Sequence, residues 1–366
     1  MKNDLAAVCS RFEIGGTLVA AGPLGIGRIN DTYEVRFTGG EHNIYVVQRI
    51  NRNVFPRPIE VMENVRRVTE HLKNKMVEAG SGDPLRNVLT LVPAKDGKCY
   101  YQDDNDNVWR TYLFIHGAVG HATVDSPEQA REGARAFGTF FAGLVDLPGG
   151  PLHETIHDFH NTLSRYAALE EAIAGDTWER AAHARDVIEF ARSRKGIADM
   201  VAEIEADSDV PRRTTHNDTK LNNVLIDEDT NEAVCVIDLD TVMPGYVLHD
   251  FGDMARTFCN TAGERSGNLD RVHLDLAIFE AIVDGYLEAA GRLMTPTERE
   301  TLVAGAKTAA YEVGIRFLTD HLAGDVYFRS EYPGQNLERA RTQLRLLESM
   351  EENEEQMREI VLSRTP

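Results

Sequence analysis

One stretch, 215–223, constrains the chain more than any other segment. It reads Thr-His-Asn-Asp-Thr-Lys-Leu-Asn-Asn, so Asp218 comes two residues after a histidine and five residues before Asn223. Two short apolar runs around a polar turn follow over 224–237, a pattern that predicts a β-hairpin. A second aspartate, Asp238, comes directly after these runs. This order predicts that the hairpin returns Asp238 to the loop that holds Asp218 and Asn223.

The spacing of these residues is typical of a kinase catalytic loop and its metal-binding aspartate. In such a loop one carboxylate, here Asp218, orients and deprotonates the acceptor hydroxyl. Asn223 and Asp238 would hold the Mg²⁺ that neutralises the nucleotide phosphates. Local Asx turns alone could account for Asp and Asn in a loop, but they would not account for the hairpin and the second aspartate. The sequence therefore predicts phosphoryl transfer with ATP and Mg²⁺ as cofactors.

The remaining patterns predict two lobes. Short β-branched or aromatic runs predict strands at 17–21, 32–37, 43–50, 88–92, 99–102 and 108–114, and an apolar stripe predicts a helix over 59–73. Helical patterns dominate afterwards, over 130–145, 164–174, 186–206, 272–291, 296–322 and 336–363. We therefore expect an α+β, bilobal, protein-kinase-like fold, with a β-rich N-lobe at 1–115 and a mainly α-helical C-lobe at 116–366.

The charge of the chain is strongly acidic, with 39 Lys and Arg against 59 Asp and Glu and a net charge of −20. Such a surface repels nucleic acid and anionic lipid, so we expect neither as a partner. No apolar stretch approaches the roughly 20 residues that span a bilayer. The N-terminus lacks a signal-peptide core, and the cysteines show no spacing typical of a zinc site or a disulfide framework. We expect a cytoplasmic protein with reduced thiols, and the oligomeric state stays open.

Beyond the catalytic loop, the chain resembles the aminoglycoside phosphotransferase and choline kinase family, whose members are small-molecule kinases with the protein-kinase fold. The likeness covers nearly the whole chain, at 29–30, 33, 47–51, 55–56, 154–156, 215–223, 237–241, 243–245, 250–253, 314–317 and 324–328. Within the family it is similar to the N-acetylhexosamine 1-kinase branch, which phosphorylates the anomeric hydroxyl of N-acetylglucosamine or N-acetylgalactosamine with ATP. The resemblance therefore implies a sugar substrate and a sugar 1-phosphate product.

The same resemblance implies a nucleotide site in the N-lobe. A glycine-rich segment around Gly25 and Gly27 precedes a predicted strand, so these glycines are expected to turn a hairpin that covers the phosphates. An ordinary β-turn is the alternative. Phe114 and Ile115, at the join of the lobes, are expected to hold adenine. Gln48 stands where the family usually has a strand lysine, and it brings a hydrogen-bond donor but no charge.

Neutralisation of the phosphates therefore depends more on Mg²⁺ and on other cations. Arg28, Arg49 and Arg52 are the candidates, although each could equally be a surface arginine, and the sequence leaves the three open. The missing lysine also favours a non-catalytic nucleotide-binding regulator as an alternative. The complete set of base and metal ligands argues against that alternative.

The resemblance implies four sugar contacts, Lys220, Asp240, Arg316 and Tyr327. Lys220 comes two residues after the base and can stabilise charge on the transferred phosphoryl group. Asp240 and Asp238 are predicted to share a strand end, which would point both side chains to one face. Arg316 interrupts an apolar helix and needs a polar partner if buried. An ion pair within the protein is the alternative for Arg316, and core packing is the alternative for Tyr327.

Two positions depart from the hexosamine-kinase branch. Arg28 stands where the branch has a histidine after its glycine turn, and Thr257 stands where it has an aromatic residue near the sugar. The sequence leaves open the anomer and the C4 epimer. A kinase of another small alcohol is the alternative, with an unsubstituted hexose, an amino sugar, an aminoglycoside or choline as acceptor. Choline is disfavoured because its cation site needs aromatic walls and the chain has only two tryptophans.

A histidine-rich segment suggests a metal site at first sight. His153, His157 and His160 are spaced four and then three residues apart, which could place them on one face of a helix. Because no carboxylate completes an established metal pattern, structural or surface roles are favoured.

Overall fold

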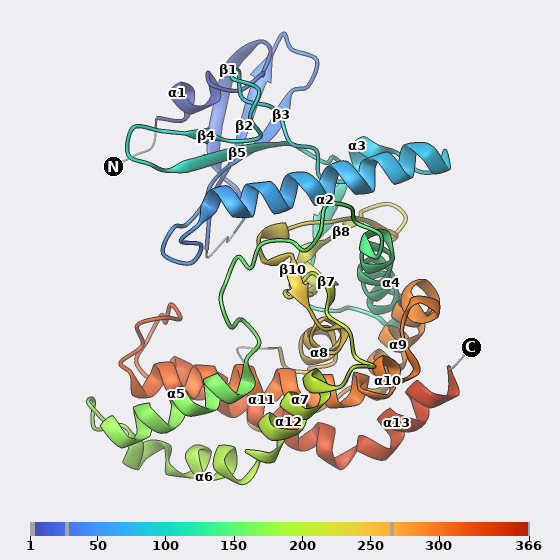
Figure 1. Cartoon of the computed structure of the whole chain (residues 1–366). Helices are drawn as coiled ribbons and strands as arrows, with labels where there is room; N and C mark the ends of the chain where they lie inside the picture. The colour runs from blue at the N-terminus through green and yellow to red at the C-terminus, as the bar shows by residue number, and fades with distance from the viewer. Residues whose placement is uncertain (1–3, 26–28, 264–266, 365–366) are drawn as a thin grey trace.

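The chain folds into two lobes, a β-rich one above a helical one in the view of Figure 1. The computed structural model describes residues 4–25, 29–263 and 267–364. The smaller lobe is built from α1 (Leu5–Cys9), β1 (Thr17–Pro23), β2 (Asp31–Thr38), β3 (Ile44–Arg49), α2 (Pro58–Ala79), α3 (Pro84–Asn87), β4 (Tyr101–Gln102) and β5 (Val108–Leu113). Its strands form one antiparallel sheet in the order β1-β2-β3-β5-β4. The kinase-like α+β fold expected from the sequence is confirmed.

Helix α2 ties this small lobe to the rest of the molecule. It begins at Pro58, whose missing N–H costs nothing in the first turn, and ends at Gly80 in the left-handed conformation. Its apolar stripe, which includes Val61, Met62 and Val65, is fully buried. These side chains belong to the same apolar cluster as Phe137 of α4 (Pro127–Leu144) in the large lobe. The two lobes therefore share one continuous core.

Two small sheets frame the predicted catalytic loop. After β5 the chain continues into β6 (Ala118–Gly120), which pairs with β8 (Val224–Asp227), and β8 pairs with β9 (Ala233–Val236). The hairpin predicted from the two apolar runs is therefore confirmed. The second sheet pairs β7 (Arg213–Thr215) with β10 (Met243–Gly245). The loop between β7 and β8 is thus held by paired strands on both sides.

Helices make up most of the large lobe, and α11 lies at its centre. Besides α4 they are α5 (Thr162–Gly175), α6 (Arg185–Ser193), α7 (Gly196–Ala206), α8 (Val247–Phe258), α9 (Leu276–Ala290), α10 (Pro296–Glu300), α11 (Leu302–Leu322), α12 (Gln335–Glu352) and α13 (Glu354–Ser363). Short 3₁₀ turns are η1 (Ala181–Ala184), η2 (Leu221–Asn223), η3 (Leu239–Thr241), η4 (Leu269–Arg271) and η5 (Gly291–Leu293). Among the described residues, no helix is long and apolar enough to span a bilayer.

Several predicted element boundaries are wrong. The segment 88–92 forms only an isolated bridge from Leu91 to Tyr112, after the short helix α3. Each of the three long C-terminal helices predicted over 186–206, 296–322 and 336–363 is two helices. The last of them breaks at Asn353, whose side chain donates to the carbonyl of Ser349. Such side-chain bonds compete with the helix backbone, and an apolar periodicity does not reveal them.

Two glycines let α8 approach the central helix α11 closely. A Cβ on Gly252 of α8 would overlap the carbonyl oxygen of Gly305, and a Cβ on Gly305 of α11 would overlap the carbonyl oxygen of Leu248. The two backbones are therefore in direct contact. This contact sets the position of α8, whose carboxylates reach the catalytic loop.

We predict that Gly305→Ala lowers the free energy of unfolding by about 1–3 kcal/mol, the usual range for overpacking a filled core. Denaturant unfolding measures this change. Gly196→Ala is the matched control, because a Cβ at that helix position meets open space. An unchanged unfolding midpoint for Gly305→Ala would contradict the close approach of α8 and α11.

Candidate active site

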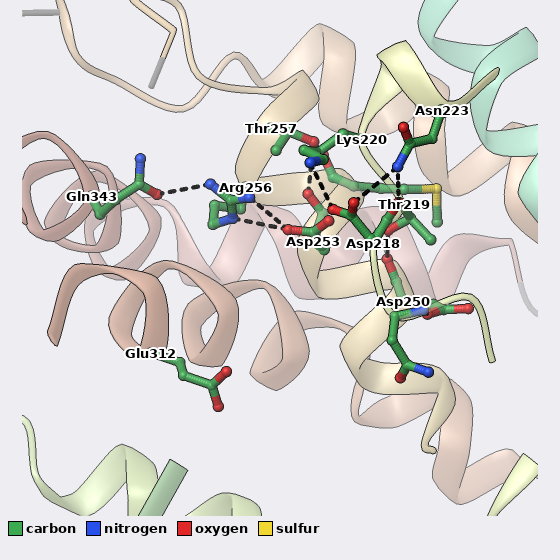
Figure 2. Close-up of polar contacts among 12 residues, drawn as sticks. Asp218, Thr219, Lys220, Asn223, Asp250, Asp253, Arg256, Thr257, Glu312 and Gln343 are labelled. Carbon is green, nitrogen blue, oxygen red and sulfur yellow. Dashed lines mark hydrogen bonds and ion pairs between the residues drawn. The ribbon is translucent and has the colours of Figure 1, made fainter. Parts of the chain in front are cut away.

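The loop between β7 and β8 brings the predicted base and its neighbours together, as Figure 2 shows. The ammonium group of Lys220 lies 3.0 Å from a carboxylate oxygen of Asp218. The side-chain amide of Asn223 donates to the backbone carbonyl of Asp218 at 2.8 Å and to its carboxylate at 3.0 Å. The carboxylate of Asp218 is therefore oriented from two sides while remaining partly open to solvent.

A buried carboxylate on α8 shapes this loop from below. Asp250 accepts hydrogen bonds from the backbone N–H groups of His216 at 2.8 Å and Asn217 at 2.6 Å. Its backbone carbonyl accepts a third from the hydroxyl of Thr219 at 2.6 Å. Asn217 itself adopts a left-handed backbone with φ of 63°. The sequence placed Asp250 among the family matches without assigning it a role, and the structure shows that it holds the loop.

Charges around Asp218 keep it ionised. Burial alone would raise the pKa of Asp218, but the charges of Lys220 and His216 outweigh burial, and the net pKa lies below its usual range. Burial likewise opposes the charge on Lys220, yet the carboxylates of Asp218 and Asp253 raise the pKa of its ammonium group well above normal. The pair is therefore a carboxylate and an ammonium ion at neutral pH.

Asp238 follows the β8–β9 hairpin and faces the same space, but not from a strand. It adopts a left-handed backbone at φ 60° and ψ 56°, and the 3₁₀ turn η3 begins directly after it. The predicted strand end shared by Asp238 and Asp240 is therefore wrong. Although Asp238 is exposed to solvent, it is set deep among protein atoms. This desolvation, together with the charges of Asp240 and Asp218, raises its pKa to about 6.

Asp240 is buried instead of lining an open site. One carboxylate oxygen forms an ion pair with Arg110 of β5, and the other accepts from the side chain of Asn30 at 2.7 Å. The Nε of Arg110 donates to the side-chain oxygen of Gln48 at 2.9 Å. Gln48 donates in turn to the hydroxyl of Thr32 at 3.0 Å. Arg110 thus contacts both Gln48, which was predicted to bind the nucleotide, and Asp240, which was predicted to bind the sugar.

Sequence reasoning missed Arg110 because its partners come from distant segments. The sequence offers a weak signal for its role, since Arg110 is the lone charged residue in the mostly buried strand Val108–Leu113. Of the three arginines proposed earlier, Arg49 pairs with Asp31, and Arg52 donates to the carbonyl of Asp106. Arg28 lies outside the described residues.

The predicted phosphate turn is only partly described. β1 and β2 are antiparallel neighbours, which agrees with a hairpin at this point. Gly25 has a φ of 67°, a backbone that favours glycine, whereas Gly27 lies outside the described residues. At the join of the lobes, Ile115 is buried and packs with Cys235, and the half-buried ring of Phe114 contacts His116.

The remaining predicted sugar residues lie together on the large lobe. The guanidinium group of Arg316, on α11, lies 5.7 Å from the ring centre of Phe159, 6.0 Å from that of Tyr327 and 5.6 Å from that of Phe328. Tyr327 is 61% exposed, so core packing does not explain it. An arginine among aromatic rings, one of them open to solvent, is able to contact a polar ligand.

A cavity of about 560 Å³ opens beside the catalytic loop. Lys220 lines it together with Arg256 and Thr257 of α8, and the segments 122–127 and 259–263 with Asp275 and Ile278 form other parts of its wall. The guanidinium group of Arg256 forms an ion pair with Asp253 at 2.7 Å (Figure 2). Thr257, where the resemblance noted a missing aromatic residue, therefore stands in the wall of this cavity.

One residue of the histidine-rich segment supports the loop from behind. The segment 151–161 is irregular, so the three histidines do not share a helical face. His160 lies 3.3 Å from the carbonyl of Asn217 and 3.1 Å from the carboxylate of Glu312, and its ring stacks on His249. Burial lowers the pKa of His160, but the hydrogen bond and charge of Glu312 outweigh it and raise the pKa above the ordinary value.

A sequence model of a protein family and several solved structures resemble this chain. The sequence model of the APH family, described as the phosphotransferase enzyme family, matches residues 21–298. The chain belongs to this phosphotransferase family. Among solved structures, it is similar to an aminoglycoside phosphotransferase from Alicyclobacillus acidocaldarius, with a TM-score of 0.60 and 14% identity over 98% of this chain and 96% of that one.

Two further solved structures share the fold. The choline kinase from Cryptosporidium parvum has a TM-score of 0.57 and 13% identity over 99% of this chain and 98% of that one. A spectinomycin phosphotransferase, solved with ADP and spectinomycin, has a TM-score of 0.53 and 14% identity over 98% and 97%. At such identities the likeness establishes the fold, and the phosphotransferase family follows from the sequence model.

The His160–Glu312 pair predicts a pH-dependent contribution to stability. Because the folded state raises the pKa of His160, the pair stabilises the fold fully below the unfolded pKa of about 6.5 and loses this effect as pH rises through the folded value. The pKa of Glu312 is lowered to about 2, so Glu312 stays charged across that window. We expect the stability deficit of His160→Gln to be larger at about pH 5.5 than at about pH 8.5.

Denaturant unfolding of both proteins at the two pH values measures this difference. His157→Gln is the matched control, because that histidine belongs to the same segment but is largely exposed. A deficit that is constant, or that grows with pH, would show that His160 is not held in its charged form.

Proposed function

We propose that this phosphotransferase is an ATP- and Mg²⁺-dependent kinase that phosphorylates the anomeric hydroxyl of an N-acetylhexosamine, giving the sugar 1-phosphate. The observation that carries the proposal is the catalytic loop, in which Asp218 is ionised, oriented by Asn223, paired with Lys220 and partly open to solvent. The fold-related spectinomycin phosphotransferase was solved with ADP, which supports a nucleotide as the phosphoryl donor.

The residues beside Asp218 fit a magnesium ion. Asp238 offers an exposed carboxylate and Asn223 offers an amide oxygen, and both are oxygen ligands of the kind that Mg²⁺ prefers. In the described part of the chain, no three His, Cys, Asp or Glu residues gather as a metal cage. This suits Mg²⁺, which usually takes its other ligands from phosphate and water. When bound there, the ion would neutralise charge on the nucleotide phosphates.

Asp218 and Lys220 have different roles in the transfer of the phosphoryl group. Asp218 holds the acceptor hydroxyl in line with the γ-phosphoryl group and accepts its proton as the new P–O bond forms and ADP leaves. Lys220, two residues further on, offers a positive charge to the oxygens of the phosphoryl group in flight. Because Lys220 also lines the cavity of about 560 Å³, an acceptor bound in that cavity would lie beside it.

The acceptor side offers groups that suit a neutral sugar. The cavity wall carries two cations, Lys220 and Arg256, and two carboxylates, Asp125 and Asp275, so its charge alone does not select between a neutral and a cationic acceptor. Arg316, set among aromatic rings, offers planar donors and apolar faces of the kind that hold sugar hydroxyls and ring surfaces. Another small alcohol remains the alternative acceptor, and an acceptor screen separates the two.

Asp218→Asn should lower kcat by on the order of 10²–10⁴-fold, because the amide cannot accept the proton. Its affinity for Mg²⁺-ADP should stay within about twofold of wild type, since the metal ligands are intact. Steady-state kinetics and calorimetric titration measure the two quantities. Asp238→Asn is the contrasting variant, and it should instead weaken nucleotide binding and change the Mg²⁺ dependence. A kcat for Asp218→Asn above a tenth of the wild-type value would exclude Asp218 as the base.

For the acceptor, NMR of the product should show phosphorus coupled to the anomeric carbon when N-acetylglucosamine or N-acetylgalactosamine is supplied with ATP. Arg316→Ala should lower kcat/KM for that sugar. The decrease should correspond to a loss of about 2–3 kcal/mol of transition-state stabilisation, as expected when a charged hydrogen-bond donor is removed. Arg192→Ala is the control, because Arg192 pairs with Glu170 on the surface of α6. Phosphate on C6, or turnover with choline alone, would reject the anomeric assignment while leaving a phosphotransferase.

A further inference from the structure

The short turn 238–242 is held by the small lobe through three polar side chains. The carboxylate of Asp240 accepts a hydrogen bond from the side chain of Asn30, which lies just before β2, and forms an ion pair with Arg110 of β5. The backbone carbonyl of Val242 receives the amide of Asn64, on α2, at 3.1 Å. All three donors are buried. The β-sheet and the helix of the small lobe thus converge on one five-residue segment of the large lobe.

The same turn is bonded to the catalytic loop. The hydroxyl of Thr241 donates to the carbonyl of His216 at 2.8 Å, and the amide of Asn217 donates to the carbonyl of Thr241 at 2.9 Å. The turn begins at Asp238, the proposed metal ligand. The turn is therefore hydrogen-bonded both to the small lobe and to the residues next to the proposed base, and it carries Asp238 at its first position.

We propose that the Arg110–Asp240 ion pair is the latch that closes the small lobe on this turn, and that both are positioning residues for the phosphoryl transfer proposed above, on which this inference rests. Each is 1% exposed. A buried charge that loses its partner is strongly disfavoured, so the two lobes cannot separate at this point without uncovering and hydrating both. Closure therefore aligns the sheet that covers the nucleotide with the turn that carries Asp238.

This latch also accounts for Gln48 at the position of the family's strand lysine. Gln48 of β3 and Arg110 of β5 are register partners in the sheet. The side-chain oxygen of Gln48 accepts from Arg110 and orients it toward Asp240. The strand beside β3 thus carries a buried cation that Asp240 neutralises, and a neutral residue on β3 that accepts a hydrogen bond from this cation suits the arrangement.

The proposal reassigns Asp240, which the sequence resemblance marked as a sugar contact. Its two oxygens are engaged by Arg110 and Asn30, and its exposure leaves little surface for an acceptor. A sugar contact would act on the KM of the acceptor. A latch would act on nucleotide affinity and kcat, would leave the acceptor KM unchanged, and would depend on Arg110.

The test compares Arg110→Met, Asp240→Asn, the double variant and Asn30→Ala. Affinity for Mg²⁺-ADP is measured by calorimetry without any acceptor, and kcat and acceptor KM are measured with the sugar. Asn30→Ala removes a neutral donor, so it remains informative if a variant with an unpaired charge fails to fold. The control is Arg131→Met with Glu288→Gln, which removes an exposed arginine–carboxylate ion pair between α4 and α9, within the large lobe.

We expect each single variant of the latch to weaken ADP binding by on the order of tenfold and to lower kcat, with the acceptor KM within about twofold of wild type. The double variant should bind ADP no more weakly than whichever of the two single variants has the lower affinity for ADP, because the two residues act as one pair. The control should change neither quantity. An Asp240→Asn variant that raises only the acceptor KM would restore Asp240 as a sugar contact and overturn the latch.

Unchanged ADP affinity in Asn30→Ala and in every folded variant of the pair would overturn it as well. Failure of the sugar assignment looks different, because it would appear as the absence of sugar turnover in the wild-type protein. The ADP measurement uses no acceptor and decides the latch in either case.

Discussion

The rest of this structure depends on one constraint. The carboxylates gathered around the loop between β7 and β8 need a positively charged or hydrogen-bonding partner. Four of them receive a dedicated partner, in the pairs Asp218 with Lys220, Asp240 with Arg110, Asp253 with Arg256, and Asp250 with the backbone N–H groups of the loop. Burying a charge without such a partner costs several kcal/mol. Each pairing therefore fixes a piece of backbone. Asp238 is the exception, because it stays exposed and its pKa is raised by desolvation and by the charges of Asp240 and Asp218.

The partners come from different parts of the chain, and this makes the site a meeting point of both lobes. Arg110 belongs to the sheet of the small lobe, whereas Asp250 and Asp253 belong to α8. The position of α8 depends on its glycine contact with α11. The geometry of the proposed base is therefore coupled to packing in the helical lobe, and the geometry of the proposed metal ligand is coupled to the small lobe.

Local patterns in the sequence predicted those parts of the site that are local in the fold. The spacing of Asp218, Asn223 and Asp238 depends on one loop and one hairpin, and both can be recognised from turn residues and apolar runs. Arg110 was missed because its partners lie 62 and 130 residues away in the chain, and such pairing follows from strand order and lobe closure. For His160 the sequence favoured a structural or surface role over a metal site, and its contacts with Asn217 and Glu312 are structural.

A crystal structure of the protein with Mg²⁺, a non-hydrolysable ATP analogue and N-acetylglucosamine tests the central account most directly. The account predicts the anomeric oxygen within hydrogen-bond reach of Asp218, the metal on Asp238 and Asn223, and Asp240 still paired with Arg110. A sugar bound to Asp240 with Arg110 turned to the phosphates, or a metal held elsewhere, would contradict it.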